Sequence, residues 1–306
     1  CCLQGRSACC RQRHPSFGGN VELDTDATST ELTDTAYDSG GRVKLQIDGR
    51  RDNGEYFAAA KGELLALVGG GSVAEDAWLM VGHTGSWNVR VGRYENEHMF
   101  PEGRDTVIVH ATSVASGNAP VPYEMDAVRG RSDNGVRLRI QGVENWMLEL
   151  GTFYGGGNNQ EMFSGIRPVA VYSGEDITLR LGLETLDDGT SDLSGAGVSV
   201  GFNAGDASFN VNLTQLDNEL GMFESTTFGA NVLFNSIAIG FYQVDTDYDT
   251  GLDPSVSTLY ASYSHMFGGI EDLYFTYAVS SSSSDDVATG SDDQVTAARL
   301  RLNYEF

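Results

Sequence analysis

The chain is organised by short segments in which apolar and polar residues alternate one by one. In residues 42–48 the odd positions are Val43, Leu45 and Ile47, and the even positions are polar. Successive side chains of a β-strand point to opposite faces, so a period of two predicts a strand with one apolar and one polar face. The pattern returns at residues 88–91, 136–141, 177–181, 198–203, 209–214, 259–264 and 273–277. We find no convincing helical period longer than two turns, apart from residues 54–68, which also read as a strand.

The connections between these segments differ in length at the two ends of each hairpin. Short turns rich in Gly, Asn and Asp lie at 51–54, 83–86, 143–145, 174–176, 204–206, 235–236 and 268–270. Longer connections alternate with them, at 29–40, 94–133, 155–165, 185–194, 216–225, 245–255 and 281–292, and one short connection near 69–73 stands where a long one is expected. This asymmetry is typical of a transmembrane β-barrel.

The segments predict sixteen strands, which begin near residues 19, 41, 55, 74, 86, 134, 145, 166, 176, 196, 207, 227, 236, 256, 271 and 293. Weak alternation in 19–28 and 74–83 leaves the count uncertain by about two strands. Most segments reach the roughly 9–11 residues that a tilted strand needs to cross a bilayer. We therefore predict an all-β fold, a transmembrane antiparallel up-and-down barrel with short periplasmic turns and long extracellular loops. A soluble β-sandwich or solenoid also alternates, but it has no reason to keep its long loops on one side.

Composition alone gives the picture of a soluble acidic protein. The formal net charge is −24, the isoelectric point is about 4.3 and the mean hydropathy is −0.24. These averages cancel the apolar face of each strand against its polar face, so they do not contradict a barrel. The acidic balance argues against a nucleic-acid partner, which requires a basic surface.

Among the alternating segments, the one at the end of the chain indicates a class of protein most specifically. Leu300, Leu302, Tyr304 and Phe306 share one face of the last eight residues. A terminal Phe that follows apolar residues at every second position resembles the C-terminal assembly signal of Gram-negative outer-membrane barrels. The resemblance implies an integral barrel of the bacterial outer membrane, in contact with its lipid and lipopolysaccharide. Tyr304 and Phe306 are then expected in an interfacial aromatic girdle.

A barrel of this size encloses a water-filled channel. We expect the polar strand faces to line it, with these candidates for pore-lining or substrate contact: Arg42, Lys44, Arg90, Arg137, Arg139, Arg180, Tyr260, Tyr274, Arg299 and Arg301. After Arg180 only Arg299 and Arg301 are basic, against nineteen acids from Glu184 to Glu305. We expect an arginine wall opposite a wall of Asn, Ser and Tyr, although each arginine can instead pair with a nearby acid.

The longest connection, 94–133, follows the fifth predicted strand. Residues 92–94 (Gly-Arg-Tyr), 99–107 (Met-Phe-Pro-Glu-Gly-Arg-Asp-Thr-Val) and 127–131 (Ala-Val-Arg-Gly-Arg) resemble the carbohydrate-selective porins of enterobacteria and vibrios. This group, the raffinose and cyclodextrin porins, implies passive diffusion of oligosaccharides such as cyclodextrins. The cyclodextrin porin further implies a monomer with about fourteen strands, within the range known for such barrels.

In porins the loop after strand five commonly folds inward and narrows the channel. Candidate residues of such a constriction are Tyr94, Glu95, Phe100, Glu102, Arg104, Asp105 and Tyr123. Sugar hydroxyls bind planar polar groups such as Arg, Asp, Glu and Asn, and pyranose rings require aromatic surfaces. Aromatic candidates are Tyr94, Phe100, Tyr123, Phe153, Tyr242, Tyr260 and Tyr274, although a Tyr in such a barrel is more often part of the girdle.

Residues 1–17 form a separate segment, and the barrel is predicted to occupy 18–306. This segment holds Arg6, Arg11 and Arg13, no acid, and all four cysteines of the chain. A flexible basic tail on an acidic barrel can enter the lumen and obstruct it. The cyclodextrin-porin resemblance implies the same role, a mobile gate that substrate displaces. The alternatives are a disordered tail and a foreign or processed end.

Other functions receive less support from the sequence. Asp245, Asp247 and Asp249 begin like a calcium loop, but the glycine falls one position late and the closing Glu is missing. We expect no cofactor, with Ca²⁺ on the acidic loops as the one candidate. We expect no enzyme, because Ser264 and His265 are neighbours on one strand and point to opposite faces. An adhesin would not explain an arginine-lined lumen. A non-specific porin is the nearest alternative, and a monomer is favoured over a trimer.

Overall fold

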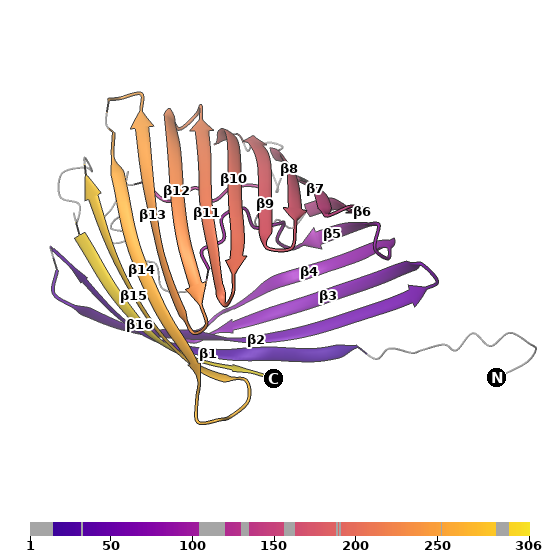
Figure 1. Cartoon of the computed structure of the whole chain (residues 1–306), viewed down its shortest axis with the longest axis horizontal. Helices are drawn as coiled ribbons and strands as arrows, with labels where there is room; N and C mark the ends of the chain where they lie inside the picture. Colours follow the sequence, from indigo (N-terminus) through magenta and orange to yellow (C-terminus); the bar gives the residue numbers. More distant parts are fainter. Residues whose placement is uncertain are drawn as a thin grey trace, which may run out of the picture.

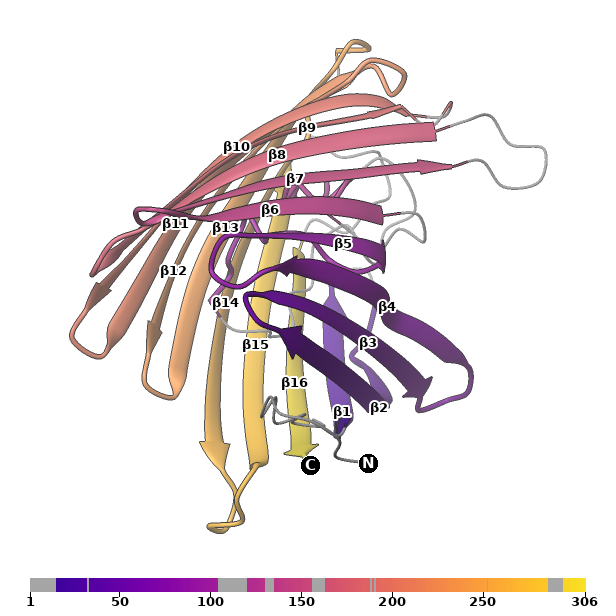
Figure 2. The same ribbon diagram turned by 90° about the vertical axis from the view of Figure 1, so that its right-hand side faces the viewer.

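The computed structural model describes residues 15–31, 33–103, 120–129, 135–155, 163–187, 189, 191–251, 253–285 and 294–306. In this part of the chain sixteen strands form one closed antiparallel barrel, in which each strand pairs with its neighbours in sequence (Figures 1 and 2). They are β1 (Ser16–Thr30), β2 (Ala36–Asn53), β3 (Tyr56–Leu67), β4 (Ser72–His83), β5 (Trp87–Arg93), β6 (Gly135–Val143), β7 (Trp146–Gly155), β8 (Phe163–Ser173), β9 (Ile177–Asp187), β10 (Asp192–Ala204), β11 (Ala207–Asn218), β12 (Phe223–Phe234), β13 (Ile237–Tyr248), β14 (Ser255–Met266), β15 (Leu273–Asp285) and β16 (Gln294–Glu305). These residues contain no helix that is both long and apolar enough to cross a membrane.

The two-residue period of the sequence separates the two faces of the barrel wall. On β2, Leu45 and Ile47 are each 51% exposed on the outside. Arg42 and Lys44, on the same strand, point inward and form ion pairs with carboxylates of the neighbouring strands. An outer face of exposed apolar side chains is what a barrel in contact with lipid requires.

The hairpins are tight at one end of the barrel, the turn end, and longer at the other, the loop end. The predicted short connection at the loop end is confirmed: Gly69, Gly70 and Gly71 turn the chain from β3 to β4 with φ angles of 107°, 108° and 94°, which residues with a side chain rarely adopt. Other predicted loops are shorter than expected. β9 and β10 continue to Asp187 and from Asp192, inside the predicted connection 185–194. Beyond the apolar belt both faces of a strand are polar, so the alternation fades although strand pairing continues.

The count of sixteen strands is confirmed, and the count of about fourteen implied by the cyclodextrin-porin resemblance is wrong for this chain. β1 and β16 close the barrel. The Gly19 N–H donates to the Phe306 carbonyl oxygen at 2.9 Å, and the Phe306 N–H donates back at 3.0 Å. β1 alternates weakly in sequence because its inner face carries the carboxylates Glu22, Asp24 and Asp26, which pair with arginines.

A β-bulge interrupts the pairing of β3 with β4, where the register shifts between Gly62 and Leu64. Consecutive residues of a regular strand point to opposite faces, and a bulge re-aims one of them. Here Asp76 lies 3.1 Å from Lys61 Nζ, and Glu75 lies 3.9 Å from an Arg42 nitrogen. Both consecutive carboxylates therefore reach cations of the inner wall.

Candidate channel lining and constriction

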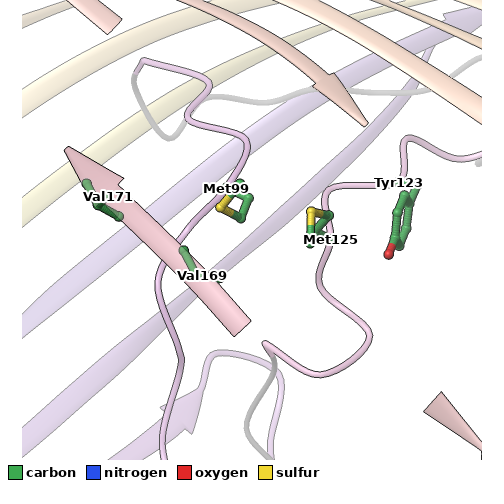
Figure 3. Packing of buried hydrophobic residues seen from close by; sticks show 5 residues of the cluster. All are labelled: Met99, Tyr123, Met125, Val169 and Val171. Atoms are coloured by element: carbon green, nitrogen blue, oxygen red, sulfur yellow. The ribbon is translucent and has the colours of Figure 1, made fainter. Parts of the chain in front are cut away.

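Two described segments of the long connection, 94–103 and 120–129, lie against the inner face of the barrel, and we call them together the inner strap. Met99, Tyr123 and Met125 of the strap pack against Val169 and Val171 of β8 (Figure 3). All five side chains are buried. Inward-facing valines are unexpected in a water-filled lumen, and here they form an apolar seat that the strap covers.

A second apolar contact joins the strap to β13 and β14. Phe100 packs with Tyr242, Val244 and Tyr260, all of which are buried. The Tyr260 hydroxyl donates to the Glu102 carbonyl oxygen at 3.0 Å. The strap thus reaches across the inner face from β8 to β14.

Polar side chains of the wall also bind the strap backbone. The side-chain amides of Asn212 on β11 and Asn231 on β12 donate to the Pro101 carbonyl oxygen, at 3.0 and 2.6 Å. The Tyr123 N–H donates to the Thr227 hydroxyl at 3.0 Å. Backbone groups of an irregular segment need such partners when they leave water.

Glycines on the inner face provide the space that the strap occupies. A Cβ atom on Gly195 would lie 1.7 Å from the Tyr123 hydroxyl oxygen, and one on Gly197 would lie 2.4 Å from Met125 Sδ. A Cβ on Gly229 would lie 2.4 Å from an aromatic ring of the strap. Any side chain at these positions requires the strap to shift.

Arg167 of β8 is the centre of a buried ionic cluster. Its side chain has no exposed surface, as is also true of Glu149 and Glu184. Its Nε–H donates to the Met125 carbonyl oxygen at 3.0 Å, and Nη2 donates to the Glu97 carbonyl oxygen at 2.9 Å. Glu149 and Glu184 lie 3.9 and 3.5 Å from its guanidinium nitrogens. A buried charge is tolerated only when it is paired and hydrogen-bonded, and Arg167 meets both conditions.

Glu184 of β9 binds the second half of the strap. Its carboxylate accepts hydrogen bonds from the Val128 N–H at 3.1 Å and the Ala127 N–H at 3.3 Å, and from the Tyr123 hydroxyl. Burial, together with the charge of Glu184, raises the pKa of Tyr123 above its usual range. The phenol therefore stays protonated and remains a donor to the carboxylate.

The first half of the strap is held by arginines of β6 and β9. Arg139 lies 3.2 Å from a Glu97 carboxylate oxygen and donates through Nε to Glu149 at 3.1 Å. Arg180 lies 3.6 Å from the other Glu97 oxygen. These two predicted pore-lining arginines thus pair with acids of the wall and the strap.

Arg90 and Arg137 lie beside the aromatic rings of Trp78 and Tyr94, and Tyr94 is the first residue of the strap. The Arg90 guanidinium lies 4.1 Å from the Trp78 ring centroid and 5.5 Å from that of Tyr94. Arg137 lies 5.7 Å from the Tyr94 ring and donates to the Asn88 side-chain oxygen at 3.0 Å. This cation–π arrangement connects β4 to the strap.

The opposite part of the wall, from β16 through β1 and β2 to β3, carries a row of ion pairs. They are Arg299–Asp26 at 2.7 Å, Arg301–Asp24 at 2.9 Å, Arg42–Glu22 at 2.8 Å, Lys44–Glu63 at 3.0 Å and Lys61–Glu63 at 2.8 Å. In this row the arginines pair with nearby acids, which was the alternative left open by the sequence, whereas the inner faces of β11 to β15 carry buried uncharged side chains such as Asn212, Thr227 and Ser280. Cations and carboxylates of adjacent strands lie side by side, because strands of opposite charge pattern are paired in register.

The structure places the other predicted residues as follows. Tyr274 lies half-buried on the inner face of β15, and Glu95 is exposed. Tyr94, Phe100, Tyr123, Phe153, Tyr242 and Tyr260 are at most 7% exposed, so the predicted aromatic surface for sugar rings is not available at these six positions. They pack within the strap and its seat instead. Arg104 and Asp105, and the gate residues Arg6, Arg11 and Arg13, lie outside the described residues.

The sequence prediction missed Arg167, Glu149, Glu184 and Trp78. The alternation of Ile166, Arg167, Pro168 and Val169 contained the signal for Arg167, since Ile166 is exposed on the outer face and Arg167 is buried on the inner one. Two features hid it. The proline interrupts the pattern, and Val169 makes the inner face apolar where a wet lumen was assumed.

No group of three or more His, Cys, Asp or Glu residues that could hold a metal ion occurs among the described residues. Asp245 and Asp247 are exposed on the outer face of β13, and the Gln243 side chain donates to Asp245 at 2.9 Å. A calcium site at Asp245, Asp247 and Asp249 stays a prediction. His98 lies 3.5 Å from Glu124 within the strap.

The chain is similar to proteins of known fold. The family described as Porin-like glycoporin RafY matches residues 19–180, more than half of the chain. No curated protein matches the chain. An anion-selective porin from Comamonas acidovorans has a TM-score of 0.72 at 13% identity, over 96% of this chain and 99% of that chain.

Two further solved structures are similar at comparable identity. A mutant of Rh. blastica porin has a TM-score of 0.63 at 18% identity, over 96% of this chain and 100% of the other. The trimer form of in-vitro folded OmpT, an outer membrane protein of Vibrio cholerae, has a TM-score of 0.63 at 14% identity, over 96% and 99% of the two chains. At these identities the likeness to the solved structures concerns the fold.

Proposed function

The chain belongs to the family described as Porin-like glycoporin RafY, and from this premise we propose that its channel passes oligosaccharides, such as cyclodextrins or other bulky sugars. The coarser function needs no proposal: the protein is an integral barrel of the bacterial outer membrane and a passive channel of the raffinose-porin type. The proposal concerns which solutes the channel favours and which parts of the chain control their passage.

The observation that carries the proposal is the pairing of charges along the inner wall. Five inward-facing cations of β2, β3 and β16 each have a carboxylate oxygen within 3.0 Å. Paired charges create a weaker long-range field than single ones, so an ion gains little from entering. The same groups still offer planar donors and acceptors, which bind neutral hydroxylated solutes.

We further propose that the inner strap sets the width of the channel. Its two halves are fixed by apolar packing and by hydrogen bonds to wall residues such as Arg167 and Asn231. A strap tied at so many points gives a constriction of constant shape, which sorts solutes by size. A sugar then moves along the ion-paired wall, on the side of the lumen opposite the strap.

Two parts of the proposal concern regulation and assembly. The part of the predicted segment 1–17 that precedes Ser16, the first residue of β1, is proposed as a gate, in which Arg6, Arg11 and Arg13 approach the lumen of the acidic barrel from the turn end and leave when substrate enters. The protein is proposed to act as a monomer, and size-exclusion chromatography with light scattering in detergent tests this. A trimeric mass would overturn it.

Planar lipid bilayers test the proposed solute class. The purified protein is expected to give discrete ohmic steps that raffinose, cyclodextrins or maltodextrins interrupt in a concentration-dependent way. A non-specific porin would give the same steps without interruption, and its liposome-swelling rates would depend on solute size alone. Absence of steps would favour the remaining alternatives, an enzyme or adhesin barrel, and would overturn the proposal.

A further inference from the structure

The aromatic residues that a sugar ring needs are largely sealed beneath the strap, but Trp78 is placed differently. The chain has three tryptophans, Trp78, Trp87 and Trp146. Trp87 and Trp146 lie on the outer face of the wall, in line with the exposed Val91 and Leu148 of their strands. Trp78 lies on the inner face of β4 and keeps part of its surface exposed.

The residues paired with Trp78 on the two neighbouring strands are a glycine and a lysine. Its register partner on β5 is Gly92, which has no side chain, and its partner on β3 is Lys61. A Cβ atom on Gly92 would lie 2.3 Å from the Ala77 carbonyl oxygen, so this position admits no side chain. No side chain therefore stands at the position paired with Trp78 on β5, and the residue paired with it on β3 has a flexible polar chain.

Charged groups surround the ring in the arrangement that sugar hydroxyls bind. Arg90 lies 4.1 Å from the ring centroid. Asp76 follows the same inner face two residues earlier, at the β3–β4 bulge, and pairs with Lys61 at 3.1 Å. Planar guanidinium and carboxylate groups beside an aromatic face combine donors, acceptors and an apolar platform.

We propose that Trp78, with Arg90, Lys61 and Asp76, forms a sugar-binding subsite in the channel wall. A pyranose ring of a neutral oligosaccharide stacks on the indole face that Arg90 does not cover, while its hydroxyls bind the guanidinium, ammonium and carboxylate groups. This inference rests on the proposed oligosaccharide function and adds a location to it. Trp78 lies between Lys61 of the ion-paired wall and Arg90, which also contacts Tyr94 of the strap, so a sugar that passes beside the strap meets the indole.

The first test measures channel blocking by raffinose for the wild type, Trp78→Ala, Trp78→Phe and the matched control Trp146→Ala. Loss of an aromatic contact is expected to weaken the apparent affinity about three- to tenfold in Trp78→Ala. Trp78→Phe keeps a ring and should fall between wild type and Trp78→Ala. Trp146→Ala, on the lipid face, should block like wild type. Single-channel conductance of each variant shows that it has folded and inserted.

The outcomes separate the subsite from the function on which it rests. If raffinose, cyclodextrins and maltodextrins all fail to block wild type, the proposed oligosaccharide function fails and the subsite fails with it. If wild type is blocked and Trp78→Ala is blocked with equal affinity, the function stands and the subsite is wrong.

Tryptophan fluorescence tests directly whether a sugar binds beside Trp78. In the Trp87→Phe/Trp146→Phe double variant, Trp78 is the remaining tryptophan, and raffinose should change its fluorescence with the concentration dependence seen in blocking. In the Trp78→Phe/Trp87→Phe double variant, only Trp146 reports, and its emission should not respond. A response confined to Trp146 would overturn the proposal.

Discussion

Arg167 and Met125 are joined by a hydrogen bond that fixes the strap to the barrel wall: the Arg167 Nε–H donates to the Met125 carbonyl oxygen at 3.0 Å. The same guanidinium donates to the Glu97 carbonyl oxygen at 2.9 Å. Met125 belongs to the second half of the strap and Glu97 to the first. One fully buried side chain of β8 therefore holds both halves of the constriction.

Replacing Arg167 by Met is expected to destabilise the protein and loosen the strap. Removal of one partner from a buried ionic cluster leaves Glu149 and Glu184 less compensated, which costs about 3–5 kcal/mol. Denaturant unfolding in detergent measures the loss, and open-channel current noise should increase. The control is Arg50→Met, since the exposed Arg50–Asp52 pair should contribute less than about 1 kcal/mol. Equal losses in the two variants would contradict the role of Arg167.

The inner-face glycines that make room for the strap give a second prediction, at Gly195. A methyl group there overlaps the Tyr123 hydroxyl, so Gly195→Ala should displace the ring and break its hydrogen bond to Glu184. We expect a loss of about 1–3 kcal/mol and a lower single-channel conductance, because the strap is displaced from the wall into the lumen. Gly49→Ala on β2 is the control, since a Cβ there meets nothing within 4 Å. An unchanged conductance in a folded Gly195→Ala channel would show that this half of the strap does not set the width.

The barrel could be predicted from the sequence because a period of two is local. Each strand shows its own two faces, so even polar segments such as β1 were found at nearly the right place. Strand ends beyond the lipid belt were missed, as at Asp187, because nothing there requires an apolar face. The orientation of Arg90 and Arg299 followed from the same alternation.

The constriction could not be predicted in the same way, because its contacts join residues far apart in the sequence. Tyr123 and Phe100 were expected in the constriction as surfaces for sugar rings, but their burial depends on Gly195 and Gly229, which make room for them. Trp78, a half-buried aromatic residue of the inner face, lies in a segment whose alternation is disturbed by the bulge at Glu75 and Asp76. The irregular alternation was a signal for the bulge, but it was interpreted as a sign that residues 74–83 form a weak strand.

The ion pairs that flank the closing strands make ion selectivity testable by opposite variants. Asp24 and Asp26 pair with Arg301 and Arg299 at 2.9 and 2.7 Å. Asp24→Asn/Asp26→Asn leaves cationic charge in excess and should shift the reversal potential in a salt gradient toward anion preference. Arg299→Gln/Arg301→Gln should shift it toward cations. Both shifts should shrink as the salt rises from about 0.1 to about 1 M, because the screening length falls from about 10 to about 3 Å.

The control for this pair of variants is Asp206→Asn, in the turn between β10 and β11. It removes one carboxylate at the turn end, away from the paired row, and should leave the reversal potential close to that of wild type. If the two double variants shift the potential in the same direction, the row of ion pairs does not control selectivity.

The proposed gate is tested by removing residues 1–15, which precede the first residue of β1, Ser16. If the basic segment enters the lumen, its removal should raise the single-channel conductance and reduce spontaneous closures. The triple variant Arg6→Gln/Arg11→Gln/Arg13→Gln keeps the length and removes the charge. It should also reduce the closures if attraction to the acidic barrel holds the gate in place. If the shortened chain keeps the wild-type conductance and closure frequency, the gate is refuted. If the deletion has an effect and the triple variant has none, the gating depends on the bulk of the segment and not on its arginines.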